Sequence, residues 1–231
     1  MNRGADRLER LHINHVDIWY EKTGQGRPVI LIHGNGEDHT IFDRTVRVLE
    51  ERFTCYLPDS RGHGKSRWTG EFHYRDMAGD LISFLEALNL RNAAVVGFSD
   101  GGIIGLLAAA ETERITSLIA CGANTRPEGF HRRYLTGMRI LHFFGRSPLV
   151  RLMIREPDIR DDELARIHAD TLIVAGEHDM VRKSETDHIA GAIPGAGKVI
   201  LSGESHASYV VHSEKLAGII LDFLSEEQNG S

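Results

Sequence analysis

Short apolar runs alternate with stretches of helical periodicity along most of the chain. Six runs have the length and composition of buried strands, at 28–33, 53–58, 93–98, 115–121, 171–175 and 198–201. A further segment, 12–20, alternates apolar and polar residues as a half-exposed strand does. Helical spacing falls between the strands at 40–51, 74–88, 101–110 and 213–224. This alternation predicts an α/β fold, a mostly parallel central sheet with helices on both faces.

The segment 125–160 interrupts this alternation. It is rich in aromatic and basic residues, namely Phe130, Arg132, Arg133, Tyr134, Arg139, Phe143, Phe144 and Arg146. We expect 1–124 and 161–231 to form the core and 125–160 to form a small helical cap. Loops at the carboxyl ends of strands in such sheets flank the ligand site, so the cap is expected to act as a lid. A packed excursion without that role is the alternative.

The bulk composition fits one globular domain that folds without metals or disulfides. The chain has 231 residues and a formal net charge of -6, with no run of Lys or Arg that suggests nucleic acid. The mild acidity also argues against an anionic membrane surface as a partner. The beginning of the chain has no apolar stretch of signal-peptide length, and no later run is long enough to span a membrane. A cytoplasmic location is expected, and the oligomeric state is left open.

Two cysteines, Cys55 and Cys121, lie in apolar, strand-like runs. We expect two buried free thiols in a reducing compartment. A disulfide between them is the alternative, since spacing alone does not exclude it.

Candidate chemistry centres on Ser99. The run GFSDG at 97–101 follows a buried strand and opens a helix. This context fits a sharp strand-to-helix turn that exposes a serine hydroxyl as a nucleophile. The alternative is a glycine-rich turn with an idle serine.

A serine nucleophile needs a base and an acid that orients the base. His206 follows a strand and precedes the final helix, which makes it the candidate base, with His212 as the competitor. Asp179 follows the strand at 171–175 and is the candidate acid, with Glu177 as the rival carboxylate. The predicted triad is therefore Ser99, Asp179 and His206.

The developing oxyanion also needs donors. The loop HGNG at 33–36 follows a buried strand, so we expect the backbone N–H groups of Asn35 and Asp100 to form the oxyanion hole. His33 is expected to order this loop and not to catalyse. The run DSRGHGKS at 59–66 lacks the phosphate-loop pattern and is interpreted as a structural turn. No metal or cofactor is expected.

These motifs, in this order, resemble the α/β-hydrolase superfamily over roughly 20–224. The family pattern includes HGxG, DxRGxGxS, GxSxG, an acid loop GxxD and a late histidine, which stand here as HGNG, DSRGHGKS, GFSDG, GEHD and ESH. The resemblance implies a serine hydrolase with the residues named above in the matching roles.

The segment 97–110, with Gly122-Ala123-Asn124 after the next strand, looks like valacyclovir hydrolase and its bacterial relatives. That group has an aspartate directly after the nucleophile, as Asp100 is here. The resemblance implies that Asp100, with Asn35 beside it, binds the α-amino group of an amino-acid ester. The alternative is that Asp100 pairs with local backbone or with Arg132 or Arg133.

The favoured function is hydrolysis of small carboxylic esters through an acyl-enzyme, with a small-molecule ester as the substrate and neither nucleic acid nor membrane as a partner. A carbon–carbon bond hydrolase with the same triad is a second hypothesis. A ligand-sensing receptor of the same fold is a third.

Overall fold

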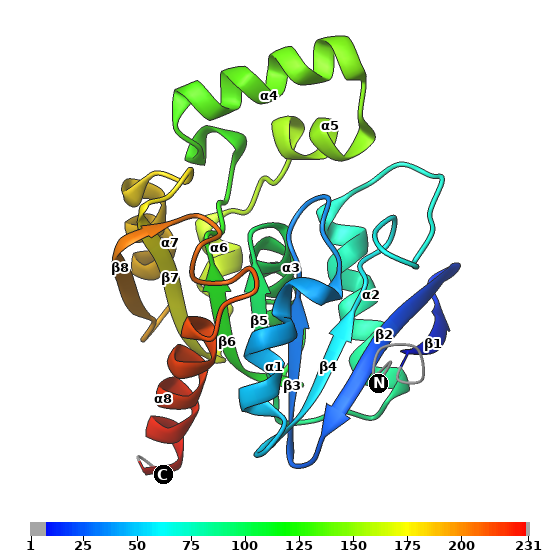
Figure 1. The fold of residues 1–231 in the computed structure, drawn as a ribbon. Helices are drawn as coiled ribbons and strands as arrows, with labels where there is room; N and C mark the ends of the chain where they lie inside the picture. Colours follow the sequence, from blue (N-terminus) through cyan, green and yellow to red (C-terminus); the bar gives the residue numbers. More distant parts are fainter. Residues whose placement is uncertain (1–7, 230–231) are drawn as a thin grey trace.

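The computed structural model describes residues 8–229, and an eight-stranded sheet forms its centre (Figure 1). The strands are β1 Leu8–Ile13, β2 Val16–Gly24, β3 Arg27–Ile32, β4 Phe53–Pro58, β5 Ala93–Phe98, β6 Ile115–Cys121, β7 Asp170–His178 and β8 Gly197–Ser205. The α-helices are α1 Asp43–Leu49, α2 Tyr74–Ala87, α3 Asp100–Ala109, α4 Arg132–Gly145, α5 Pro148–Arg155, α6 Asp161–Leu164, α7 Lys183–Ala192 and α8 Lys215–Asn229. Two short 3₁₀ helices are η1 His39–Phe42 and η2 Pro127–Gly129.

The strand order is β1-β2-β4-β3-β5-β6-β7-β8. The pairs β1–β2 and β2–β4 are antiparallel, and every pair from β4 to β8 is parallel. The carboxyl ends of six strands therefore lie along one edge of the sheet, and loops that leave them can meet there. The predicted α/β-hydrolase fold is confirmed.

Helices cover both faces of this sheet (Figure 1). One apolar core cluster joins the sheet to α2, α3, α6 and α7, and the other joins it to α1 and α8. All six residues of β5 are buried, because this central strand has neighbours on both sides and helices on both faces. Its continuous apolar run, AAVVGF, is the pattern expected of such a strand.

Three predicted elements differ from the structure. The single strand expected at 12–20 is a hairpin of β1 and β2, because Asn14 and His15 both adopt positive φ, as a two-residue turn between strands requires. Strands β7 and β8 extend past the expected ends. Helix α7 was not predicted, and its surface is mostly polar with Ile189 as its one fully buried apolar residue.

Helices α4 and α5 occupy the segment for which a cap is predicted. They lie above the carboxyl edge of the sheet, outside the two helical layers (Figure 1). A small apolar cluster around Phe130, Leu135 and Val181 connects α4 to the loop after β7. An isolated bridge between Phe130 and Val181 adds backbone pairing at the same place. The segment is thus attached to the core near the loop that carries Asp179.

The two cysteines are free and buried, as predicted. Burial raises the pKa of each thiol to about 12. Within residues 8–229, no helix combines the length and the apolar character that a membrane span needs.

Candidate active site

Ser99 lies at the turn between β5 and α3. Its φ of 54° and ψ of -113° are strained for a residue other than glycine, and they are the conformation expected of a serine that is pushed out of a strand-to-helix turn. The turn is held by two backbone hydrogen bonds, from Ser99 N–H to Cys121 O at 2.7 Å and from Gly102 N–H to Ser99 O at 2.9 Å.

Two glycines make this tight turn possible. A Cβ atom on Gly97 would lie 2.1 Å from the carbonyl oxygen of Gly101, and a Cβ atom on Gly101 would lie 2.1 Å from that of Ile32. Both contacts are with backbone, so neither can be relieved by a rotamer change. The glycines of the GFSDG motif are therefore required by the packing of α3 against β5 and β3.

Three side chains from three loops meet at the carboxyl edge of the sheet. His206 Nε2 lies 3.1 Å from Ser99 Oγ, and His206 Nδ1 lies 2.6 Å from Asp179 Oδ1. These distances fit the tautomer in which Nδ1–H donates to the carboxylate and Nε2 accepts from the serine hydroxyl. The aromatic ring of Phe98 packs beside the imidazole, with 5.0 Å between ring centroids.

Asp179 is buried and fixed by its own loop. Its Oδ1 also accepts a hydrogen bond from Val181 N–H at 2.9 Å, and Oδ2 accepts one from Gly176 N–H at 3.3 Å. The rival Glu177 is exposed and accepts hydrogen bonds from Ser202 Oγ and Gly203 N–H, which lower the pKa of its carboxyl group. Glu177 is therefore bonded away from the histidine.

The competing histidine also lies elsewhere. His212 Nδ1 is 2.8 Å from Asp43 Oδ1, near the start of α1. The structure thus brings together the three residues favoured from the sequence and leaves both of their rivals outside the cluster.

The loop after β3, which carries the HGNG motif at 33–36, lies against Ser99. Gly34 packs so closely on Ser99 that a Cβ atom there would be 3.2 Å from the serine Cβ. Asp100 is the first residue of α3, so its N–H has no partner within the helix. In the described part of the chain, neither Asn35 N–H nor Asp100 N–H donates to another protein group. Both donors are available to an oxyanion.

The carboxylate of Asp100 is buried and already has two donors. Its Oδ2 accepts from Asn35 Nδ2 at 2.8 Å, and its Oδ1 accepts from Tyr74 Oη at 2.7 Å. Burial raises the pKa of this carboxyl group, and the two hydrogen bonds oppose that rise. Arg132 and Arg133 were expected as alternative partners, but both are exposed and the observed partners come from the core instead.

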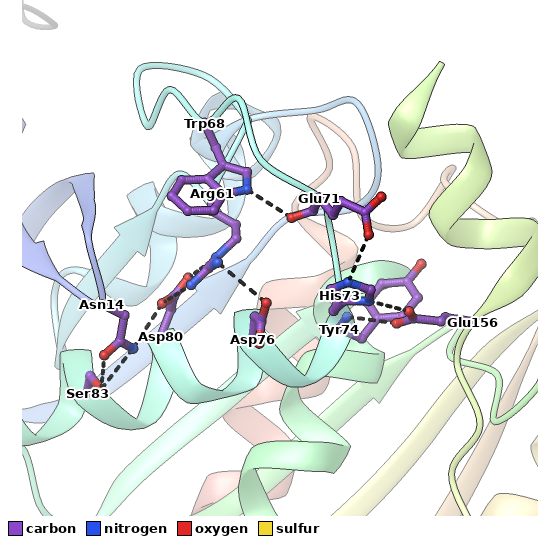
Figure 2. Close-up of polar contacts among 10 residues, drawn as sticks. All are labelled: Asn14, Arg61, Trp68, Glu71, His73, Tyr74, Asp76, Asp80, Ser83 and Glu156. Carbon is purple, nitrogen blue, oxygen red and sulfur yellow. Dashed lines mark hydrogen bonds and ion pairs between the residues drawn. The ribbon is translucent and has the colours of Figure 1, made fainter. Parts of the chain in front are cut away.

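The cap is tied to this network at both ends of α5. Asn35 Nδ2 also lies 3.3 Å from the carbonyl oxygen of Leu149. At the other end, Glu156 accepts from His73 Nδ1 at 2.6 Å and from Tyr74 N–H at 3.1 Å (Figure 2). The carboxylate of Glu156 raises the pKa of His73 by this hydrogen bond. The turn at Ser99, the loop at 33–36 and the cap therefore share one set of polar contacts.

The turn at 59–66 is held by side chains of the core. Arg61 donates to both carboxylate oxygens of Asp80 at 2.6 Å, and its guanidinium stacks over Trp68 (Figure 2). His33 accepts a hydrogen bond from Ser60 N–H at Nε2, and its Nδ1 lies 2.8 Å from Gly34 O. His33 thus connects the loop at 33–36 to this turn.

Two residues of the site were missed at the sequence level. Glu37 accepts from Gly34 N–H at 3.0 Å beside the nucleophile, and burial raises the pKa of its carboxyl group. An acid directly after the HGNG motif was the available signal. Tyr74, the donor to Asp100, begins a helix and gave no comparable signal. Within residues 8–229, no group of His, Cys, Asp and Glu side chains is arranged to hold a metal ion.

A mostly parallel sheet with a strained serine between β5 and α3 is the arrangement of a large class of hydrolases. Comparison with known proteins gives the same class. The chain belongs to the alpha/beta hydrolase fold family, whose model matches residues 27–149. The matched part contains the loop at 33–36 and Ser99 and ends before Asp179 and His206. The chain is therefore assigned to the hydrolases, and its substrate has to be inferred from the site.

Among curated proteins, the chain is 28% identical to the AB hydrolase superfamily protein YisY of Bacillus subtilis (strain 168), with 90% of this chain and 96% of that protein covered. It is also 28% identical to Serine hydrolase BPHL of Homo sapiens, with 93% and 85% covered. A solved bromoperoxidase from Bacillus anthracis superposes with a TM-score of 0.83 at 22% identity, covering 94% of this chain and 99% of that one. The last similarity concerns the fold alone.

Proposed function

We propose that this chain is a serine hydrolase that cleaves small carboxylic esters through an acyl-enzyme. The observation that carries the proposal is the continuous set of hydrogen bonds from Ser99 Oγ through His206 to Asp179. A buried carboxylate that orients a histidine, which in turn contacts a serine held in a strained turn, is the arrangement that activates a hydroxyl at neutral pH. The N–H groups of Asn35 and Asp100, which have no protein acceptor, would stabilise the negative charge that develops on the carbonyl oxygen.

In acylation, Ser99 Oγ attacks the ester carbonyl carbon while His206 Nε2 takes the hydroxyl proton. The carbonyl oxygen becomes negative and is held by the N–H groups of Asn35 and Asp100. When the carbon–oxygen bond to the leaving group breaks, His206 returns the proton to the departing alkoxide. The products of this half-reaction are a free alcohol and an ester of Ser99.

In deacylation, a water molecule loses a proton to His206 Nε2 and adds to the acyl carbon. The same two N–H groups hold the second oxyanion. The bond to Ser99 Oγ then breaks, and the serine takes the proton back from His206. Asp179 keeps its proton-free state throughout and stabilises the imidazolium that forms in both steps.

Esters of α-amino acids are a narrower substrate class within this proposal. Asp100 directly follows Ser99 in the sequence. Its carboxylate would be the partner of an ammonium group next to the scissile carbonyl. Because both of its oxygens accept hydrogen bonds, an ammonium group would have to take the place of Asn35 Nδ2 on Oδ2. Selectivity for a free amine would support this narrower class.

A substrate panel tests the proposal. The purified chain is assayed on p-nitrophenyl esters of increasing acyl length, on aminoacyl esters and on a vinylogous ketone cleaved at a carbon–carbon bond. We expect turnover of the short esters and its loss in Ser99→Ala, with Ser202→Ala as the matched control at an exposed serine. Turnover of the ketone alone would favour a carbon–carbon bond hydrolase. A single turnover with retained product would favour a ligand sensor.

A further inference from the structure

The outer surface of α4 carries an unusual group of apolar side chains. Ile140 and Leu141 are 56% and 60% exposed, and Phe143 and Phe144 are 76% and 81% exposed. Of the large apolar residues that are exposed in the described chain, these are four of five. We call these four residues the cap patch. Contiguous apolar side chains at such exposure mark an interaction site, whereas scattered ones are ordinary.

The cap patch is surrounded by positive charge. The segment 131–155 contains six arginines and no acidic residue, in a chain whose net charge is -6. Within the described residues, Arg132, Arg146 and Arg155 have no carboxylate within ion-pair distance. Charge on this segment is therefore opposite in sign to that of the molecule as a whole.

Helix α4 is amphipathic in a way that leaves this surface uncovered. Its inner side is anchored by Leu135, which is buried, and by Met138, both in the small cluster with Phe130 and Val181. The outer side combines the cap patch with exposed arginines. A basic helix with large apolar residues on its exposed side is the pattern of helices that lie in a lipid interface.

Charge decides between the candidate occupants. A second copy of the chain would bring two sets of arginines without carboxylate partners together across a symmetric interface, which like-charge repulsion disfavours. An anionic lipid surface offers phosphate groups to the arginines and an apolar layer to Phe143 and Phe144. Screening limits surface electrostatics to about 8 Å at physiological ionic strength, so the local positive charge outweighs the distant negative charge.

We propose that α4 docks this protein on an anionic lipid surface through the cap patch and its arginines. The net negative charge of the whole chain would argue against such a partner only if the charge were spread evenly over the surface. Since α4 is the outermost element above the carboxyl edge of the sheet, docking would turn the edge that carries Ser99 toward the lipid (Figure 1). The inference stands on surface residues and does not depend on the proposed chemistry.

Sedimentation of the full chain with vesicles tests the proposal. Vesicles of phosphatidylcholine with phosphatidylglycerol are compared with vesicles of phosphatidylcholine alone, at low and physiological salt. We expect binding only to the anionic vesicles. Phe143→Ser with Phe144→Ser should weaken it at least about tenfold, and Arg132→Gln with Arg133→Gln should weaken it on the order of fivefold per residue.

Matched controls are Val199→Ser and Arg91→Gln, which change an exposed apolar and an exposed basic residue elsewhere. Both should bind as the unaltered chain does. Absence of binding at low salt, or full binding by the double phenylalanine variant, would overturn the proposal. So would a dimer that this variant dissociates, or equally tight binding to soluble polyglutamate, which would assign the patch to a protein partner. Circular dichroism confirms that each variant keeps its helices.

Discussion

The side-chain amide of Asn35 donates a hydrogen bond to the carboxylate of Asp100, with 2.8 Å between Nδ2 and Oδ2. These are the two residues whose backbone N–H groups we propose as the oxyanion hole. Their contact therefore sets the spacing of two loops that are far apart in the sequence. Donors that are held in place before the reaction stabilise a developing charge without reorganisation.

Removal of this contact should slow the reaction more than it weakens substrate binding. Asp100→Ala leaves Asn35 Nδ2 and Tyr74 Oη without their buried acceptor and frees the oxyanion loop. We expect kcat for a neutral ester to fall on the order of 10²–10³-fold, as for the loss of an oxyanion donor. Tyr74→Phe keeps the Asn35 contact and should retain most of the rate. An unchanged kcat in Asp100→Ala would show that this side-chain contact does not position the oxyanion donors, since the backbone N–H of residue 100 is still present.

Selectivity for a free amine tests the narrower substrate class. If the ammonium group of a substrate contacts Asp100, the unaltered enzyme should prefer an aminoacyl ester over its N-acetylated form by roughly 10- to 150-fold in kcat/KM, the value of one charge-assisted hydrogen bond. Asp100→Asn, which can still accept from Asn35, should narrow that ratio. Equal rates on the two esters would leave only the general esterase proposal.

The two carboxylates after β7 should differ sharply. Asp179→Asn removes the acceptor of His206 Nδ1–H and favours the wrong tautomer, so kcat should fall by roughly 10⁴-fold. Glu177→Gln changes an exposed group that contacts Ser202 and Gly203 and should alter the rate little. Steady-state kinetics on one ester compare the two variants. The opposite order of effects would show that the acid is wrongly assigned.

Acid should destabilise the fold through His33. Burial lowers the pKa of this imidazole from 6.5 to about 4. Between these two pKa values the unfolded chain binds a proton at His33 that the folded chain does not bind. The free energy of unfolding therefore rises with pH between about 4 and 6.5, and the destabilising effect of this group is absent above that range. Between pH 7 and 4.5 this single group should cost about 2–3 kcal/mol.

Urea unfolding at several pH values measures that cost by difference. In His33→Gln the loss of stability between pH 7 and 4.5 should be smaller than in the unaltered chain by about that amount. His168→Gln, at an exposed histidine, serves as the control and should leave the slope as it is. Parallel pH curves for all three chains would show that His33 is not held neutral by the fold.

The sheet could be predicted because its central strands are continuous apolar runs. The bounds of β4, β5 and β6 agree with the runs read from the sequence, since these strands are buried on both faces. The strands at the β1 edge of the sheet were harder to predict. The single strand expected there runs across Asn14 and His15, and the positive φ values of these two residues show that the chain turns into a hairpin between β1 and β2.

The triad candidates Ser99, Asp179 and His206 could also be predicted from the sequence, because each one directly follows a strand at the same edge of the sheet. The hydrogen-bond partners of Asp100 could not be predicted in this way. The contact between Tyr74 and Asp100 joins residues 26 positions apart in different elements. Nothing in the local pattern indicates which donor will reach a buried carboxylate, since packing of α2 against α3 decides it.

The central claim is that Ser99 is a nucleophile activated by His206. Treatment with a fluorophosphonate probe, followed by peptide mass spectrometry, tests it most directly, because such probes label a serine that has an activating base. The account predicts a single adduct on the peptide that contains Ser99, with labelling abolished in Ser99→Ala and strongly slowed in His206→Gln. An unlabelled Ser99 in active enzyme, or equal labelling in the His206 variant, would contradict it.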